Sequence, residues 1–221
     1  MKTILAMAAM LIVLAPAVHA ADMSQELGLT GPQSFGFTDK VGKNEAKFSS
    51  KAPLEDIDGT ADGISGQFML NPANIETSKG KVEVRVASMQ TGIKKRDEHM
   101  FSATWLDAET HPTISFDIKK LTDVKVTSKS DAKVVLTAKA HGSFVMRGVE
   151  REMVTDVTLT ILPESEKTRE RAPGDFLMVK TAFAVPLSAH NVAGKGDIIG
   201  SKVSENIQVE VNLYGTNGMA R

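Results

Sequence analysis

The chain has 221 residues, with 26 Lys and Arg against 27 Asp and Glu, and it contains no Cys. The near-neutral charge argues against nucleic-acid binding, which needs a clear basic excess, and the lack of Cys excludes disulfide bonds. A chain of this length can bury a sizeable core without such cross-links, as one domain or two.

The first twenty residues have the pattern of an export signal. A basic residue, Lys2, precedes an apolar run over residues 4–18, and the small residues Val18 and Ala20 form a cleavage site. We therefore expect residues 1–20 to be a cleaved signal peptide that directs the protein to the bacterial periplasm. A membrane anchor is the alternative, but a spanning helix needs about 20 apolar residues, and this run is shorter.

The rest of the chain is expected to form one domain, because no linker rich in Pro, Ser or Gly divides its middle. The most polar stretch, residues 163–174, lies between strand-like segments and is interpreted as a solvated loop. We expect a polar lead-in over residues 21–33, the domain over residues 34–215 and a tail over residues 216–221.

Alternation of apolar and polar residues is the dominant pattern in this domain. It is clearest at residues 81–86, 113–118, 156–161 and 207–213, and period-two alternation predicts strands with one buried face and one wet face. Weaker strand candidates are residues 45–50, 63–70, 123–127, 133–140, 141–146 and 177–185.

Strands of this kind favour an all-β domain with antiparallel sheets, because strands buried on both faces would be apolar throughout. Closure into a barrel removes the sheet edges, although a two-sheet sandwich has the same alternation. Residues 92–108 break the pattern: Ile93, Met100, Phe101 and Trp105 fall on one helical face. We expect one or two short helices there.

Three segments of the chain contain distinctive motifs. The first runs through ASMQTGI at residues 87–93, RDEHM at 96–100, WLD at 105–107 and HPTISF at 111–116. The second is GSFVMRGVER at residues 142–151, and the third is ISGQF at residues 64–68. Together these segments resemble the YceI family. The segments near residues 36–39 and 183–188 depart from the family pattern, which leaves the identity of a ligand less defined than the fold.

The resemblance implies a lipocalin-like, closed antiparallel β-barrel of about eight strands around an apolar cavity, a size that can hold one ligand. It also implies a periplasmic carrier that binds a polyisoprenoid lipid, either an isoprenoid quinone or a polyprenyl phosphate. The strand phase and the helical segment then predict the residues that line the cavity, although a register error of one residue would invert any strand. These residues are Phe68, Val82, Val84, Val86, Met100, Phe101, Trp105, Ile114, Phe116, Ile118, Val157, Leu159, Val209 and Val211.

Arg96, Asp97 and His99 are the candidates for contact with a head group. Arg96 could meet a quinone oxygen or a phosphate, or it could form an ion pair that pins the helix to the barrel. The sequence shows no set of metal ligands and no nucleophile motif, so we expect no metal, no cofactor and no enzymatic activity.

A second hypothesis is a structural or stress-response protein whose barrel is filled by its own side chains and retains no ligand. Transient contact with a membrane surface is a further expected interaction of the protein. The oligomeric state is left open by the sequence, a dimer included.

Overall fold

The computed structural model describes residues 22–218, and the expected signal peptide at residues 1–20 therefore lies outside the described residues. The strands are β1 (Gln33–Phe37), β2 (Glu45–Lys51), β3 (Asp56–Ala61), β4 (Ile64–Leu70), β5 (Lys79–Arg85), β6 (Met89–Gln90), β7 (Thr113–Ser130), β8 (Lys133–Met146), β9 (Val149–Leu162), β10 (Phe176–Pro186) and β11 (Asn206–Thr216). The helices are α1 (Ser24–Leu27), α2 (Lys94–Phe101) and α3 (Glu166–Arg169), with 3₁₀ segments η1 (Pro72–Thr77), η2 (Val86–Ser88), η3 (Ser188–His190) and η4 (Gly196–Ile198). Among the described residues, no helix is both long and apolar enough to span a membrane.

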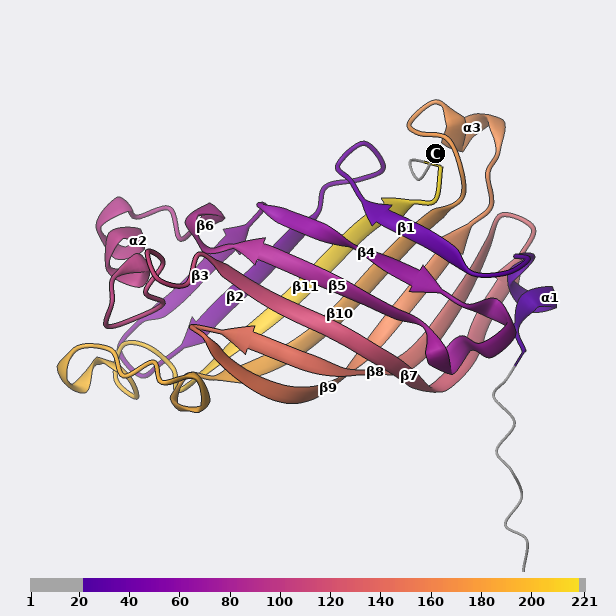
Figure 1. The fold of residues 1–221 in the computed structure, drawn as a ribbon. Coiled ribbons are helices and arrows are strands. Elements are labelled where there is room, and N and C mark those ends of the chain that lie inside the picture. The colour runs from indigo at the N-terminus through magenta and orange to yellow at the C-terminus, as the bar shows by residue number, and fades with distance from the viewer. Residues whose placement is uncertain (1–21, 219–221) are drawn as a thin grey trace, which may run out of the picture.

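The strands form a closed antiparallel barrel (Figure 1). Over residues 22–218 the ring contains eight strands in the order β1, β4, β5, β7, β8, β9, β10 and β11, and it closes where Gly36 of β1 pairs with Thr216 of β11. Closure leaves none of these eight strands as a free edge, which is the physical advantage of a barrel over an open sheet. The predicted all-β barrel is confirmed.

Part of the wall is built from interrupted strands. β11 pairs with β1 near Thr216 and with β2 from Gln208 to Asn212. β1 and β2 therefore lie one after the other along the same side of β11. β4 pairs with β1 while β3 pairs with β2, and β6 continues the wall beside β3. The barrel is therefore lined by different strands at its two ends.

The alternating segments form strands as predicted, with two differences in extent. Residues 113–118 and 123–127 were expected as separate strands but form the single strand β7. Residues 133–140 and 141–146 were expected as separate strands but form the single strand β8. Gly142 permits this continuity, because a Cβ atom at that position would lie 2.1 Å from the carbonyl oxygen of Asp117 in β7. A two-residue turn of Arg147 (φ 51°) and Gly148 (φ 70°) then joins β8 to β9, and positive φ at both positions matches a type I′ hairpin.

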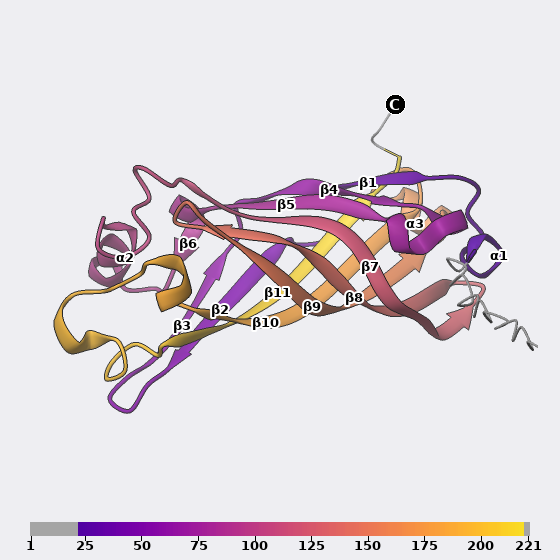
Figure 2. The ribbon, with the colours of Figure 1, turned by 60° about the horizontal axis from the view of Figure 1, so that its bottom comes forward.

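The two ends of the barrel differ in what covers them (Figures 1 and 2). α2 confirms the predicted short helix near residues 92–108, and it lies at the same end as the loop of residues 187–205. α1 and η1 lie at the opposite end, where the amide of Met23 donates to the carbonyl of Pro72 over 2.8 Å.

The interior near α1 and η1 is packed with side chains. The cluster there includes residues with at most 2% exposure: Leu27, Phe35, Phe68, Leu70, Ile75, Leu121, Leu136, Ala140, Leu159, Ile161 and Leu177. Residues 21–33, expected to be a polar lead-in, contribute Met23, Leu27 and Leu29 to this cluster, because a short helix turns its few apolar side chains onto the barrel end.

The C-terminal boundary also differs from the expected one. Thr216 is the last residue of β11 and is 1% exposed, and the Asn217 side-chain amide donates to Gln33 over 3.1 Å. The described domain therefore includes residues that were expected to form a tail.

Candidate functional site: a cavity in one half of the barrel

The half of the barrel near α2 encloses a cavity of about 880 Å³. This volume lies near the upper end of the roughly 300–1,000 Å³ found for small-molecule sites. The wall is formed by every strand except β1 and β4, whose buried side chains Phe35, Phe68 and Leu70 belong to the packed half. The interior of this barrel is therefore half filled and half hollow.

The wall below the opening is apolar because the inward positions of the alternating strands are apolar. Its members are Ala46, Phe48, Ile57, Ala61, Val82, Val84, Met89, Ile114, Phe116, Ile118, Phe144, Met146, Val157, Val179, Phe183, Val185, Leu187, Val192, Ile207, Val209, Val211 and Leu213. Such a surface can bind an apolar molecule through the hydrophobic effect and offers few groups for specific polar recognition.

The cavity ends at a floor of four side chains, Ile118, Val157, Val179 and Leu213. All four line the cavity and also belong to the packed cluster. Near the floor, the hydroxyls of Thr155 and Thr181 lie 2.9 Å apart, and Thr181 donates to the Asp156 carbonyl over 2.8 Å. Their hydroxyl groups are thus paired with protein atoms.

The mouth of the cavity lies between three segments: α2 with residues 102–105, the β2–β3 turn, and the loop of residues 187–205. The amide of Leu54 in the turn donates to the carbonyl of Ser201 over 3.0 Å, and the amide of Gly194 donates to that of Thr104 over 3.2 Å. These backbone hydrogen bonds join the three segments into a continuous rim.

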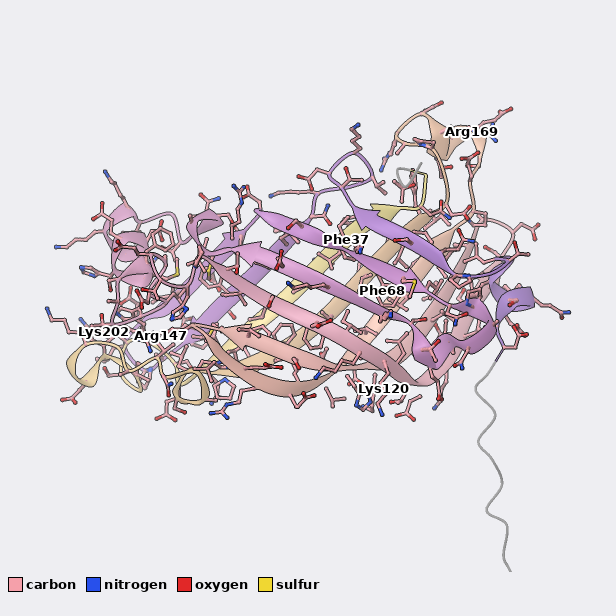
Figure 3. The ribbon with its side chains drawn as sticks, in the orientation of Figure 1. Phe37, Phe68, Lys120, Arg147, Arg169 and Lys202 are labelled. Carbon is pink, nitrogen blue, oxygen red and sulfur yellow. The ribbon has the colours of Figure 1, made fainter. Side chains whose placement is uncertain are left out.

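Arg147 holds two of these segments from the tip of the β8–β9 hairpin. Its guanidinium donates from Nη1 to the Asn191 carbonyl over 2.5 Å and from Nη2 to the Ala103 carbonyl over 2.8 Å. Figure 3 shows Arg147 and Lys202 at this end of the barrel and Arg169 at the other. The left-handed turn conformation of Arg147 therefore positions a side chain that supports the rim.

The three head-group candidates occupy different environments. Arg96 and His99 line the mouth, whereas Asp97 does not. Asp97 instead accepts hydrogen bonds from the Thr91 amide over 2.8 Å and the Thr91 hydroxyl over 2.6 Å, which fixes the first turn of α2 to the chain before it. Arg96 donates to Glu55 over 2.9 Å, so the ion pair between helix and barrel is present.

Ten of the predicted wall residues lie on the cavity wall: Val82, Val84, Met100, Trp105, Ile114, Phe116, Ile118, Val157, Val209 and Val211. Four do not: Phe68, Val86, Phe101 and Leu159. Phe68 and Leu159 face inward at the level of the packed cluster. Val86 belongs to η2 and packs with Phe101 in a second apolar cluster beside the mouth.

The wall also contains residues outside the predicted set. Phe48 and Phe183 lie in segments whose alternation was weak, and Phe183 meets Phe144 edge-on with ring centroids 5.9 Å apart. Lys195 and Lys202 come from an irregular loop, where no periodic pattern indicates which side chains face the cavity.

Among residues 22–218, His190 is the one titratable residue in the buried polar set. The residue is 2% exposed, its Nδ1 lies 3.2 Å from the Val149 carbonyl oxygen, and its ring meets the Phe144 ring edge-on with centroids 5.4 Å apart. Burial lowers the pKa of His190 below 6.5, although the backbone contacts to Val149 and Met146 oppose the shift. This histidine supports the β9 end rather than lining the cavity.

Within residues 22–218, no three side chains of His, Cys, Asp or Glu gather closely enough to hold a metal ion. The charged groups around the cavity are confined to its mouth. The fold and the site together define a class of protein: a closed antiparallel barrel with an apolar cavity open at one end.

Comparisons with known proteins assign the family. Residues 39–214 match the model of the YceI-like domain, and the chain belongs to the YceI-like family. It is 36% identical over 103 residues to a UPF0312 protein of Pseudomonas fluorescens, a match that covers 46% of this chain and 50% of that protein. The chain thus matches about half the length of this curated relative.

Two solved structures share the fold. BcnA of Burkholderia cenocepacia superimposes with a TM-score of 0.62 at 18% identity, over 79% of this chain and 97% of BcnA. A polyisoprenoid binding domain from Saccharophagus degradans, implicated in plant cell wall breakdown, gives a TM-score of 0.57 at 11% identity, over 84% of this chain and 98% of that domain.

Proposed function

We propose that this protein is a periplasmic binding or carrier protein for a polyisoprenoid lipid, whose tail occupies the cavity, and that it acts without catalysis. The observation that carries the proposal is the cavity of about 880 Å³, with an apolar wall and with charged residues at its mouth. Membership of the YceI-like family and the likeness to a polyisoprenoid binding domain support it.

The physical chemistry of the wall favours a tail of this kind. Each CH₂ group transferred from water to the wall contributes about 0.8 kcal/mol. Even a short prenyl chain would therefore supply most of the favourable free energy of binding, after the cost of ordering the chain is subtracted. Val82, Ile114, Phe116, Val209 and Val211 would contact the tail, and Trp105 and Met100 would contact it near the mouth.

The carrier is proposed over the filled, ligand-free barrel because a cavity of about 880 Å³ remains in the half near α2, beside the buried side chains of Phe144, Met146 and Val185. The side chains of Leu136, Leu159 and Ile161 occupy the packed half, yet nothing in the described chain fills the space between the floor and the mouth. The periplasmic location is supported by the export pattern at residues 1–20.

A transient contact with a membrane surface is part of this proposal, since a lipid must enter and leave. Two large apolar side chains are exposed at the mouth: Leu54 in the β2–β3 turn is 71% exposed, and Ile93 before α2 is 52% exposed. Lys94 lies beside Ile93 with its side chain 91% exposed. Apolar side chains with adjacent lysines are suited to an interface between water and lipid.

Extraction of the purified protein with organic solvent, followed by mass spectrometry, tests the proposal. The protein is purified without detergent from a bacterium with an intact periplasm. We expect a prenyl lipid in near-stoichiometric amount. Repeated recovery of protein without any lipid, from preparations that can be loaded with none, would contradict the carrier function.

A further inference from the structure

The wall of the cavity is only partly paired between β9 and β10. Their backbone pairing ends at Val157 and Thr181, at the level of the cavity floor. Both strands continue beyond this point toward α2, β9 over residues 149–156 and β10 over residues 182–186. On their other sides these two segments still pair with β8 and β11. They face each other through edges that do not pair, and this part of the wall is called the split.

The outward side chains beside the split are apolar. Residues 182–187 read AFAVPL without a polar side chain, although Ala182, Ala184 and Pro186 are exposed. On the opposite strand, Val154 is 55% exposed. A strand with one wet face normally alternates, and an unbroken apolar run belongs to a strand that is covered on both faces. A group of exposed apolar residues at one place on the wall marks a site of contact with an apolar partner.

The split also borders the cavity from the inside. Phe183 and Val185 of β10 line the cavity wall. A groove of about 850 Å³ lies on the outside of the wall, and Val157, Thr181 and Val211 line both the groove and the cavity. A single layer of residues therefore separates the cavity from the outer surface at the point where the pairing ends.

Two threonines close the split at the floor. The hydroxyls of Thr155 and Thr181 lie 2.9 Å apart, one from each strand. Thr181 also donates to the Asp156 carbonyl over 2.8 Å, and Thr155 donates to the Ala182 carbonyl over 3.4 Å. These side-chain hydrogen bonds form a clasp at the point where the backbone pairing ends.

η3 closes the split at the mouth. Arg151 of β9 donates from Nε to the Ala189 carbonyl over 3.0 Å, and His190 Nδ1 lies 3.2 Å from the Val149 carbonyl oxygen. Figure 2 shows the β8–β9 hairpin and β10 diverging toward α2, with part of the loop of residues 187–205 between them. Opening the split breaks side-chain hydrogen bonds and leaves the ladders with β8 and β11 in place, so it requires less free energy than separating two paired strands.

We infer that the split is a lateral portal, through which the apolar tail of the ligand enters and leaves the cavity sideways between β9 and β10. This inference rests on the proposed function and adds the route that the ligand takes. A tail that leaves only through the mouth must thread along its whole length. A slot that continues to the mouth lets the tail move out of the wall across Val154, Ala182 and Ala184, which reduces its contact with water.

Cross-linking tests the inference, because the chain contains no native Cys. In the double variant Val154→Cys, Ala184→Cys, a short bis-maleimide joins the two strands across the split. The transfer of a fluorescent prenol from the loaded protein to vesicles of phosphatidylethanolamine and phosphatidylglycerol is timed before and after the reaction. We expect the cross-link to slow the transfer by about tenfold or more, because it blocks a local opening. The dissociation constant should stay the same, since entry and exit are slowed together.

The matched control is Thr158→Cys, Lys180→Cys, which joins the same two strands where their backbones already pair. Directly opposed residues of neighbouring strands have Cβ atoms about 5 Å apart, so the same reagent can span them. Cross-linking should leave the transfer rate of this control unchanged. A slowing equal to that of the split variant would overturn the portal, since a cross-link that leaves the split free would then have the same effect.

A second variant removes the clasp. Thr155→Val, Thr181→Val keeps the shape of both side chains, and removing the two hydroxyls together should change the stability little. Transfer should become faster by about threefold to tenfold, because the opening then breaks fewer hydrogen bonds. Its control, Thr158→Val, Thr160→Val in the paired part of β9, should transfer at the wild-type rate.

The outcomes separate this inference from the proposed function. An unchanged transfer rate in the cross-linked split variant overturns the portal and leaves the carrier intact, because the prenol still binds. Where the reagent does not join the two cysteines, the threonine variant decides, and a wild-type rate then overturns the portal. Failure of the wild-type protein to bind the prenol contradicts the proposed function itself.

Discussion

The Arg96 guanidinium and the Glu55 carboxylate, 2.9 Å apart, join α2 to the β2–β3 turn across the rim of the cavity. Glu55 has a side chain that is 43% exposed, so Glu55→Gln should lower the free energy of unfolding by less than about 1 kcal/mol. Arg96→Ala removes three hydrogen bonds, one to Glu55 and two to Thr91, and should cost about 1–3 kcal/mol. Urea denaturation measures both, and a larger loss for Glu55→Gln than for Arg96→Ala would contradict this account of the rim.

The packed and hollow halves should respond differently to the same truncation. Ile161 belongs to the packed cluster and Ile114 lines the cavity. Ile161→Ala should cost about 2–5 kcal/mol of stability because it leaves a new void. Ile114→Ala should cost less, since part of that side chain already borders empty space and loses fewer contacts. Equal losses in ligand-free protein, measured by chemical denaturation, would argue that the cavity is closed in solution.

Acidification should destabilise the protein through His190. Burial lowers the folded-state pKa of this group below 6.5, so between the two pKa values the unfolded chain binds more protons. The stabilisation is therefore complete above about pH 6.5 and is lost as the pH falls toward the folded-state pKa. Denaturation between pH 7 and pH 5 should show this decline, and His190→Gln should reduce it. An NMR titration that gives His190 a pKa above 6.5 would contradict the expected sign.

Exposed apolar side chains at the mouth should assist transfer to membranes. The double variant Leu54→Ser, Ile93→Ser should slow the transfer of a fluorescent prenol to vesicles of phosphatidylethanolamine and phosphatidylglycerol by about tenfold, because burying each side chain contributes more than about 1 kcal/mol. Val126→Ser is the control, since Val126 is 36% exposed on β7 and does not line the cavity. Equal transfer rates for the double variant and the wild type would contradict a role of these two mouth residues in contact with the membrane.

Strand phase predicted which side chains point inward, but not their level along the barrel. Val157 and Leu159 are two residues apart on one face of β9, yet Val157 lines the cavity while Leu159 is packed. The difference arises because α1 and η1 close one end and bring side chains from many strands to the same level. The sequence of a single strand therefore does not indicate which of its inward side chains lie at the packed level of the barrel.

The charged residues that line the mouth of the cavity were predictable only in part. Arg96 and His99 lie in a segment with a recognisable pattern, and both line the mouth. Lys195 and Lys202 lie in an irregular loop whose position depends on two tertiary hydrogen bonds, from Leu54 to Ser201 and from Gly194 to Thr104. Since such contacts join residues far apart in the chain, local patterns cannot indicate them.

The central claim is that the hollow half of the barrel holds an apolar chain. A crystal structure of the protein loaded with geranylgeranyl phosphate tests it most directly. We predict continuous ligand density from the mouth near Trp105 to the floor at Val157 and Val179. A ligand bound only on the outer surface, with the cavity empty or occupied by water, would contradict the claim.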